Sequence, residues 1–434
     1  MNAVDLNTLE AWQAARLLAR RELRAADLMR ACLERIAQRD GEIHAFAHLD
    51  PQQALAQAEA LDRGTIRGLL HGLPLGVKDL FDTVDFPSSY GSPIYAGHRP
   101  KSDAAAVALC REAGALVIGK TVTTEFAFFH PGPTCNPHNP RHTPGGSSSG
   151  SAAAVADHMV PLALGTQTSG SVIRPAAYCG VVGYKASSGR VPRAGVKSIS
   201  EALDTLGGFG RSVRDVALLA TVLTGDRRLN EGLEHLQAPR IGMCQTAEWP
   251  HADADTQRAW AEASALLIHH ARSTVDVSLP DDLPDLVVLQ KEIMAFQMYQ
   301  ALSYERLRKP DQLSRRMQAQ MIAGSSISGA THAHHLWQTR IAKRRVNAVF
   351  DEFDVLVAPS AAGEAPLGTD ATGDPVFCRG WTLLGLPCVH LPFARGSHGL
   401  PIGVQLIGRW GDDHRLLAHA QWVHDRLTSG ASGG

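Results

Sequence analysis

Hydrophobic positions follow helical spacing at the start of the chain and then collect into short apolar runs. Leu28, Cys32, Leu33 and Ile36 recur at helical intervals, so residues 7–62 are predicted to be helical. Apolar runs at 75–77 and 115–119, with a predicted helix at 103–113 before the second run, are typical of buried strands. This alternation of strand and helix predicts an α/β fold.

The second half of the chain continues the alternation. Strands are predicted at 241–243, 275–277, 355–357, 388–391 and 402–407, and helices at 212–224, 253–271 and 412–427. Residues 285–350 have a helical pattern and are rich in charge, which favours a covering segment rather than a core element.

These patterns divide the chain into four parts and a tail. The parts are N-terminal helices over 1–62, a first core part over 63–225, a variable helical covering segment over 226–345, and a second core part over 346–428. The last residues, 429–434, read SGASGG and are predicted to be disordered.

Length and charge narrow the classes of protein. A chain of 434 residues predicts, by length alone, two or three domains. The net charge of −1 argues against a nucleic-acid surface, and no apolar run is long enough to cross a membrane. The acidic residues near the N-terminus argue against a signal peptide. Seven dispersed cysteines without a CxxC pair favour reduced thiols and a cytoplasmic protein, with a catalytic cysteine as the minor alternative.

The stretch Thr143–Arg190 holds two clusters of Gly and Ser. A predicted helix at 152–155 and a predicted strand at 162–164 separate them, so a flexible linker is a poor explanation. Ordered elements flanked by Gly and Ser indicate tight turns that present hydroxyl groups and free backbone N–H groups. Acyl-transfer chemistry uses both kinds of group.

Three arrangements compete as the source of a nucleophile. Residues 146–150 match G-x-S-x-G, but the preceding residues read as a loop, whereas a nucleophile elbow requires a strand there. The S-x-x-K pattern does not occur, because no Ser lies three positions before a Lys. In the third arrangement a second serine and a lysine activate Ser171. The backbone N–H groups of Thr168, Ser169, Gly170 and Ser171 could then converge on a developing oxyanion.

Lys78 directly follows the apolar run at 75–77. Burying an ammonium group is costly. The side chain therefore either reaches the surface or pairs with Asp79 or Asp82, or it is a desolvated amine with a lowered pKa that can act as a base. The residues around Lys78 leave these alternatives open.

Five blocks of sequence resemble the amidase signature family. They are PLGVKDLFD at 74–82, GALVIGKT at 114–121, GGSSSGSAAAVA at 145–156, PLALGTQTSGSVIRPAAYCGVVGYK at 161–185 and PIGVQLIG at 401–408. The resemblance covers nearly the whole chain and is strongest to the malonamidase-like branch. It implies one large α/β/α domain over 1–434, with a central mixed sheet flanked by helices, in place of two or three domains.

The resemblance also implies a mechanism. Ser171 would be the nucleophile, Ser147 a proton relay on a cis peptide bond after Gly146, and Lys78 the base. The products would form through an acyl-enzyme intermediate without a metal or an organic cofactor. The implied substrates are small amides, with anilides, carbamates and aryl esters as extensions, and a homodimer is a further expectation.

The chain departs from the family pattern beside the nucleophile candidate. Ser169 replaces a Gly that many members have before the nucleophile. Arg174 is the third residue after Ser171, as in the malonamidase-like branch, where this Arg can hold a substrate carboxylate. The alternative is that Arg174 forms a structural ion pair. Further pocket residues are expected from the family, namely Phe128, Phe129, Gln297, Met298 and Trp381.

Three other functions are weighed against a free-standing amidase. The family includes an amidotransferase subunit, which needs partner chains, and the scaffold could serve as a non-catalytic assembly protein. The intact Lys78, Ser147 and Ser171 argue against a non-catalytic role. His332, His334 and His335 suggest a metal-dependent hydrolase, but they lack a nearby set of carboxylates and more closely resemble a surface cluster.

Overall fold

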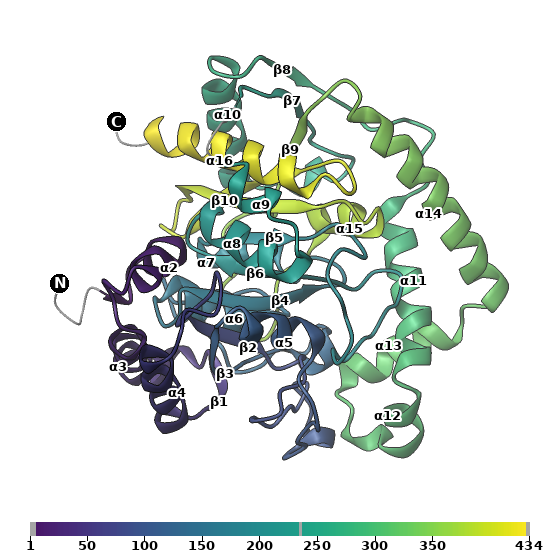
Figure 1. Ribbon diagram of the computed structural model, residues 1–434. Helices are drawn as coiled ribbons and strands as arrows, with labels where there is room; N and C mark the ends of the chain where they lie inside the picture. The colour runs from purple at the N-terminus through teal and green to yellow at the C-terminus, as the bar shows by residue number, and fades with distance from the viewer. Residues whose placement is uncertain (1–5, 234–236, 431–434) are drawn as a thin grey trace.

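A single mixed sheet runs through the molecule. The computed structural model describes residues 6–233 and 237–430. Within these ranges, eleven strands follow the order β1-β3-β2-β4-β6-β5-β10-β11-β9-β7-β8 (Figure 1). β2 is parallel to β3 and β4, β7 is parallel to β8 and β9, and the remaining pairs are antiparallel. The prediction of two or three domains is therefore wrong, and the single α/β domain is confirmed.

Most strands are buried on both faces, which explains why they read as unbroken apolar runs. Their bounds are β1 (Phe46–Leu49), β2 (Pro74–Lys78), β3 (Leu116–Thr121), β4 (Leu162–Gln167), β5 (Val182–Lys185), β6 (Thr205–Gly210), β7 (Arg240–Met243), β8 (Ser273–Asp276), β9 (Val355–Pro359), β10 (Cys388–Arg395) and β11 (Pro401–Ile407). The strands predicted from apolar runs each overlap one of these.

Three strands were not predicted. β1 lies inside the region predicted to be all helical. β5 lies near the end of the stretch Thr143–Arg190 and β6 follows that stretch, and neither has a strong strand signal. β6 reads TLGGFG, and its glycines have poor intrinsic strand propensity. The close approach of the neighbouring strand accounts for one of them, because a Cβ on Gly207 would lie 1.9 Å from the carbonyl oxygen of Tyr184.

The helices are α2 (Ala11–Ala19), α3 (Ala25–Ile43), α4 (Pro51–Arg63), α5 (Ala105–Glu112), α6 (Ser149–Ala156), α7 (Ile173–Cys179), α8 (Val213–Thr224), α9 (Arg228–Glu231), α10 (Ala254–Ile268), α11 (Leu286–Ala301), α12 (Ser303–Arg308), α13 (Arg315–Ser325), α14 (Gly329–Val349), α15 (Val376–Leu383) and α16 (Asp413–Gly430). None of the helices in the described ranges is long and apolar enough to cross a membrane. Because α16 continues to Gly430, residues 429 and 430 are helical rather than disordered, and 431–434 lie outside the described residues.

Helices cover both faces of the sheet, and two adjacent residues of β6 show this. A Cβ on Gly208 would contact Leu219 of α8. The next residue, Phe209, points to the opposite face of the sheet. On that face a Cβ on Gly165 would contact both the ring of Phe209 and Ser148, the residue before α6. α6 and α8 therefore lie on opposite faces, as the α/β/α prediction requires.

The helices α11 to α14 lie together at one side of the sheet (Figure 1, green) and make up most of residues 285–350, which were predicted to be helical and to cover the core. Apolar residues of α11, among them Ile293 and Met298, form a cluster with Leu80, which follows β2, and with Phe126. This cluster seats the covering helices over the carboxyl end of β2, where Lys78 lies.

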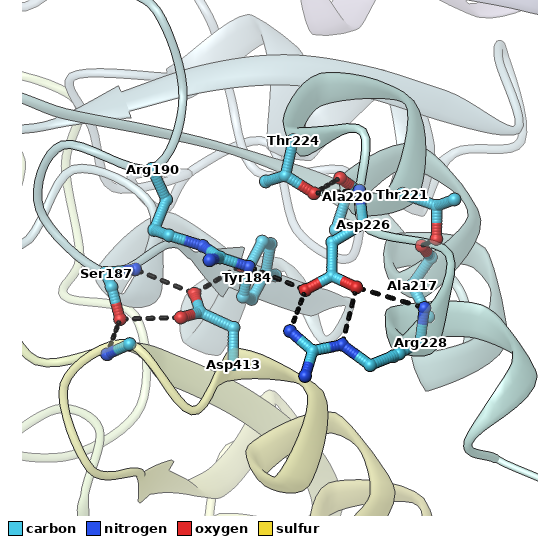
Figure 2. A network of polar contacts seen from close by, with 11 residues as sticks. Tyr184, Ser187, Arg190, Ala217, Ala220, Thr221, Thr224, Asp226, Arg228 and Asp413 are labelled. Atoms are coloured by element: carbon cyan, nitrogen blue, oxygen red, sulfur yellow. Dashed lines mark hydrogen bonds and ion pairs between the residues drawn. The ribbon is translucent and has the colours of Figure 1, made fainter.

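One buried carboxylate joins the last helix to the sheet (Figure 2). Asp413, the first residue of α16, accepts hydrogen bonds from the hydroxyl of Tyr184 at 2.6 Å and from the backbone N and Oγ of Ser187 at 2.8 and 2.6 Å. Burial and the adjacent Asp413 raise the pKa of Tyr184 well above its usual value, so its hydroxyl remains a donor. The network thereby fixes α16 against β5.

We predict that Asp413→Asn lowers the free energy of unfolding by about 2 kcal/mol or more, because the amide replaces one acceptor oxygen with a donor that faces other donors. Asp425→Asn, at an exposed position of the same helix, is the control and should change it by less than about 0.5 kcal/mol. Urea unfolding followed by circular dichroism measures both. Equal effects of the two substitutions would contradict this role of Asp413.

Candidate active site

Lys78 is buried at the carboxyl end of β2, and its amine contacts two hydroxyl groups. Nζ lies 2.8 Å from Oγ of Ser147 and 2.8 Å from Oγ1 of Thr166, and the residue is 0% exposed. Thr166 lies in β4, the parallel neighbour of β2. Two adjacent strands therefore position the lysine and one of its partners, because parallel strands end at the same edge of the sheet.

The alternative pairing of Lys78 with Asp79 or Asp82 is wrong. Asp79 forms an ion pair with Lys120 at 2.9 Å, and Asp82 accepts a hydrogen bond from the hydroxyl of Tyr90 at 2.6 Å. Burial lowers the pKa of Lys78 well below its usual value, and the nearby carboxylate of Asp204 opposes this shift only in part. The neutral amine that these surroundings favour can accept a proton.

Ser147 lies in the turn that precedes α6. The peptide bond between Gly146 and Ser147 is cis, as the resemblance implies. The start of α6, directly after this turn, is packed closely: a Cβ on Gly150 would lie 2.1 Å from the carbonyl oxygen of Ala45 and 2.4 Å from the backbone nitrogen of Val122. Only a glycine fits at this position of the first Gly/Ser cluster without displacing the backbone of β3 or its neighbours.

Ser171 lies in the loop between β4 and α7 and is 6% exposed. Within the described residues, neither its hydroxyl nor the backbone N–H groups of Thr168, Ser169, Gly170 and Ser171 have a hydrogen-bond partner. Buried backbone N–H groups are rarely left without partners. Four consecutive unpartnered donors beside a free hydroxyl are the arrangement that a developing oxyanion would complete.

Two side chains, Gln167 at the end of β4 and Thr382 of α15, hold this loop in place. Oε1 of Gln167 accepts hydrogen bonds from the backbone nitrogens of Val172 and Ile173 at 2.8 and 3.0 Å. Nε2 of Gln167 donates to Oγ1 of Thr382 at 2.9 Å, and that hydroxyl donates to the carbonyl of Ser169 at 2.7 Å. The loop is thus fixed on both sides of the nucleophile candidate.

Ser169 fits at the position where many members have Gly, because its φ is not positive. Its hydroxyl accepts a hydrogen bond from Nε2 of Gln290 at 2.9 Å. Asp204 supports the loop from the other side: its carboxylate accepts from Oγ1 of Thr168 at 2.7 Å and from the backbone nitrogens of Ile199 and Ser200 at 2.9 and 3.1 Å.

Arg174 is buried, and its donors contact the backbone. Nε and Nη2 donate to the carbonyl of Gly146 at 3.2 and 2.6 Å, and Nη1 donates to the carbonyl of Gly373. Burial lowers the pKa of Arg174 to about 10. The alternative of a structural ion pair is wrong, because the described residues place no carboxylate against Arg174. Its guanidinium instead connects α7 to the peptide that precedes Ser147.

The expected pocket residues are not all brought together. The ring of Phe129 lies 5.5 Å from the guanidinium carbon of Arg174, and Phe128 packs edge-on against Phe129. Gln297 instead binds the hydroxyl of Ser200 at 2.6 Å. Trp381 packs in an apolar cluster and lines a separate cavity of about 930 Å³ that contains none of the proposed triad. Met298 belongs to the apolar cluster under α11.

The three histidines of α14 point to different partners. Nε2 of His335 lies 3.2 Å from a carboxylate oxygen of Glu292, whereas His332 stacks on the ring of Phe296. The ring of His334 stacks on Trp337. They do not share one ligand-binding centre.

Sequence reasoning missed several residues of the site. Thr166 and Gln167 lie within the recognised signature stretch but carry no obvious chemical signal of their own. Gln290 and Arg379 come from α11 and α15, and only the tertiary structure brings them to Ser169.

The family described as Amidase matches residues 27–417. A glutamyl-tRNA(Gln) amidotransferase subunit of Cereibacter sphaeroides (strain ATCC 17029 / ATH 2.4.9) is 33% identical over 97% of this chain and 96% of its own length. The putative amidase AmiD of Mycobacterium tuberculosis (strain ATCC 25618 / H37Rv) is 33% identical over 98% and 95%.

Two solved structures share the fold. The native peptide amidase from Stenotrophomonas maltophilia aligns with a TM-score of 0.83 at 27% identity, over 96% of both chains. A structure described as a vestigial protein complex that reveals the origins of an s-triazine catabolic enzyme aligns with a TM-score of 0.88 at 28% identity, over 96% of this chain and 98% of that one. Family, fold and motifs agree, and the chain belongs to the amidase signature family.

Proposed function

We propose that this protein hydrolyses a C–N bond of a small amide through Ser171, Ser147 and Lys78. The observation that carries the proposal is the 2.8 Å contact between a fully buried, unpaired lysine amine and the hydroxyl of Ser147. A lysine in these surroundings has a use as a base, whereas as an ammonium group it would be left without a carboxylate partner.

In the proposed reaction, neutral Lys78 accepts the proton of Ser147 while Ser147 accepts the proton of Ser171. Oγ of Ser171 attacks the amide carbonyl, and the backbone N–H groups of residues 168–171 stabilise the oxyanion, each donor contributing roughly 3 kcal/mol. The tetrahedral intermediate collapses, and the amine leaves with a proton returned from Lys78 through Ser147. Water then hydrolyses the acyl-enzyme by the same proton route.

The proton transfer from Ser171 to Ser147 is part of the proposal and not an observed contact, because no hydrogen bond joins the two hydroxyls in the described residues. Catalytic hydrogen bonds often tighten only when substrate is bound. The near-complete burial of Ser147 and Ser171, at 2% and 6% exposed, favours small amides. Anilides, carbamates and aryl esters are the proposed extensions, and a place in the malonamidase-like branch stays a prediction.

Similarity to amidotransferase subunits favours a second candidate function. Relatives with that name match 97% of this chain, and their name implies partner chains. If the protein served in such an assembly, the same site would release an amine for transfer rather than to solvent. Hydrolysis of a free amide by the purified chain alone would favour the amidase; turnover only with partner chains would favour the amidotransferase role.

We predict that Ser171→Ala lowers kcat by at least about 10⁴-fold, because the nucleophile is removed. Ser148→Ala, at the central serine of the G-x-S-x-G match, is the control and should keep at least roughly a tenth of the activity. Steady-state release of ammonia or aniline measures both. A Ser171→Ala enzyme as active as the Ser148→Ala enzyme would disprove the assignment.

The acidic limb of the pH profile of kcat/KM should report the pKa of Lys78. Protonated Lys78 cannot accept a proton, so activity falls as the pH falls through its pKa. The carboxylate of Asp204 raises that pKa, so Asp204→Asn lowers it and moves the acidic limb of kcat/KM to lower pH. Asp425→Asn, at an exposed site, should leave the limb in place. A limb that moves to higher pH, or does not move, in Asp204→Asn would contradict Lys78 as the titrating base.

A further inference from the structure

A cavity of about 930 Å³ lies apart from the proposed triad, at one end of the sheet where β7 and β8 run parallel (Figure 1). Its lining includes Met243 and Asp276, the last residues of these strands, and parts of the loops that follow them. Parallel strands commonly bind ligands in the crevice beyond their carboxyl ends. Lys78 and Thr166 lie at the carboxyl ends of β2 and β4, and the cavity has the same relation to β7 and β8.

Helix α15 separates this cavity from the loop that carries Ser171. One face of the helix lines the cavity with Val376, Phe377, Gly380 and Trp381. The opposite face holds the loop, where Oγ1 of Thr382 donates to the carbonyl of Ser169 at 2.7 Å. A ligand in the cavity would therefore lie behind the helix and away from the proposed reacting groups.

The cavity has the size of a small-molecule site. Binding sites for compounds of drug size enclose about 300 to 1,000 Å³ and combine apolar walls with a few polar groups. Apolar side chains form part of the walls here, among them Leu279 and Leu283 of the loop after β8, Leu286 of α11, and Phe377 and Trp381 of α15. These walls favour a ligand with an apolar body.

Acidic side chains give the cavity its charge. The carboxylates of the lining are Glu248, Asp276, Asp281 and Asp285. The lining also holds His251, but no Lys or Arg of the described residues. Asp285 caps α11, because its carboxylate accepts from the backbone nitrogens of Val287 and Val288, both at 2.9 Å, and its charge offsets the positive end of that helix. The side chains of the other three acids have no hydrogen-bond or ion-pair partner within the described residues, so their negative charge is in excess.

A shielded hydroxyl adds a polar contact to this lining. Oγ1 of Thr246, in the loop after β7, is shielded from solvent and has no hydrogen-bond partner within the described residues. An ammonium group carries three donors and no acceptor, so carboxylates and a hydroxyl oxygen can satisfy all three. An anionic ligand would be repelled by the three unpaired carboxylates.

We propose that this cavity binds an organic cation, namely a protonated amine with an apolar body. The body would lie against α15, and the ammonium group would bind the carboxylates of Glu248, Asp276 and Asp281. Charge-assisted hydrogen bonds of this kind are stronger than neutral ones. The site is additional to the amide hydrolysis proposed for Ser171 and does not depend on it.

The test compares phenylbutylammonium with phenylbutanol of the same chain length, which share the apolar body and differ in the charged group. In calorimetric titrations of the wild-type protein at neutral pH, we expect the ammonium compound to bind at least about tenfold more tightly than the alcohol. The triple variant Glu248→Gln, Asp276→Asn and Asp281→Asn should bring this ratio to near one. The matched control removes three exposed carboxylates outside the cavity and should keep the ratio; its substitutions are Glu22→Gln, Glu112→Gln and Glu352→Gln.

A second variant tests the same site without removing any carboxylate. Ser278→Arg, at an exposed position of the lining, adds a fixed positive charge and should abolish binding of the ammonium compound. Ser326→Arg, at an exposed position after α13, is its control and should not weaken binding. Circular dichroism checks that each variant folds. Failure of the ammonium compound to bind the wild-type protein, equal binding of the two compounds, or a ratio that survives either cavity variant in a folded protein would overturn the proposal.

Discussion

The proposed chemistry of this protein depends on the burial of one amine. Lys78 lies at the end of a central strand, fully shielded from water, and its nearest partners are two hydroxyls rather than a carboxylate. Water exclusion makes the neutral form of the amine favourable, and the geometry gives that form a proton donor at 2.8 Å. If Lys78 were paired as Lys120 is with Asp79, it would remain an ammonium group and could not serve as a base.

The remainder of the fold positions two strand ends, one turn and one loop at this site. β2 and β4 end at the same edge and bring Lys78 to Thr166, and the turn before α6 brings Ser147. Gln167 and Thr382 hold the loop that carries Ser171, and Arg174 connects that loop's helix to the turn. Side chains with fixed partners place the proposed reacting groups. The N–H groups of residues 168–171 have no partner within the described residues and would be free to bind a substrate oxygen.

The sequence predicts features that depend on neighbouring residues, and it does not predict contacts between residues that are far apart in the chain. Apolar runs locate the buried strands, because a strand buried on both faces is apolar throughout. β6 was missed because its glycines carry no strand signal, and the contact that requires Gly207 comes from the neighbouring strand. The triad candidates lie in recognisable motifs. Gln290 and Arg379 could not be predicted, because α11 and α15 meet the loop only after folding, over sequence separations of 121 and 210 residues.

The central claim is that Lys78 activates Ser171, and covalent labelling of the serine tests it directly. A fluorophosphonate reacts with an activated serine hydroxyl, and mass spectrometry identifies the modified residue. The account predicts stoichiometric labelling of Ser171 in the wild-type protein, with a rate that falls steeply in Lys78→Ala. Labelling of a different residue, or labelling of Ser171 at the same rate without Lys78, would contradict it.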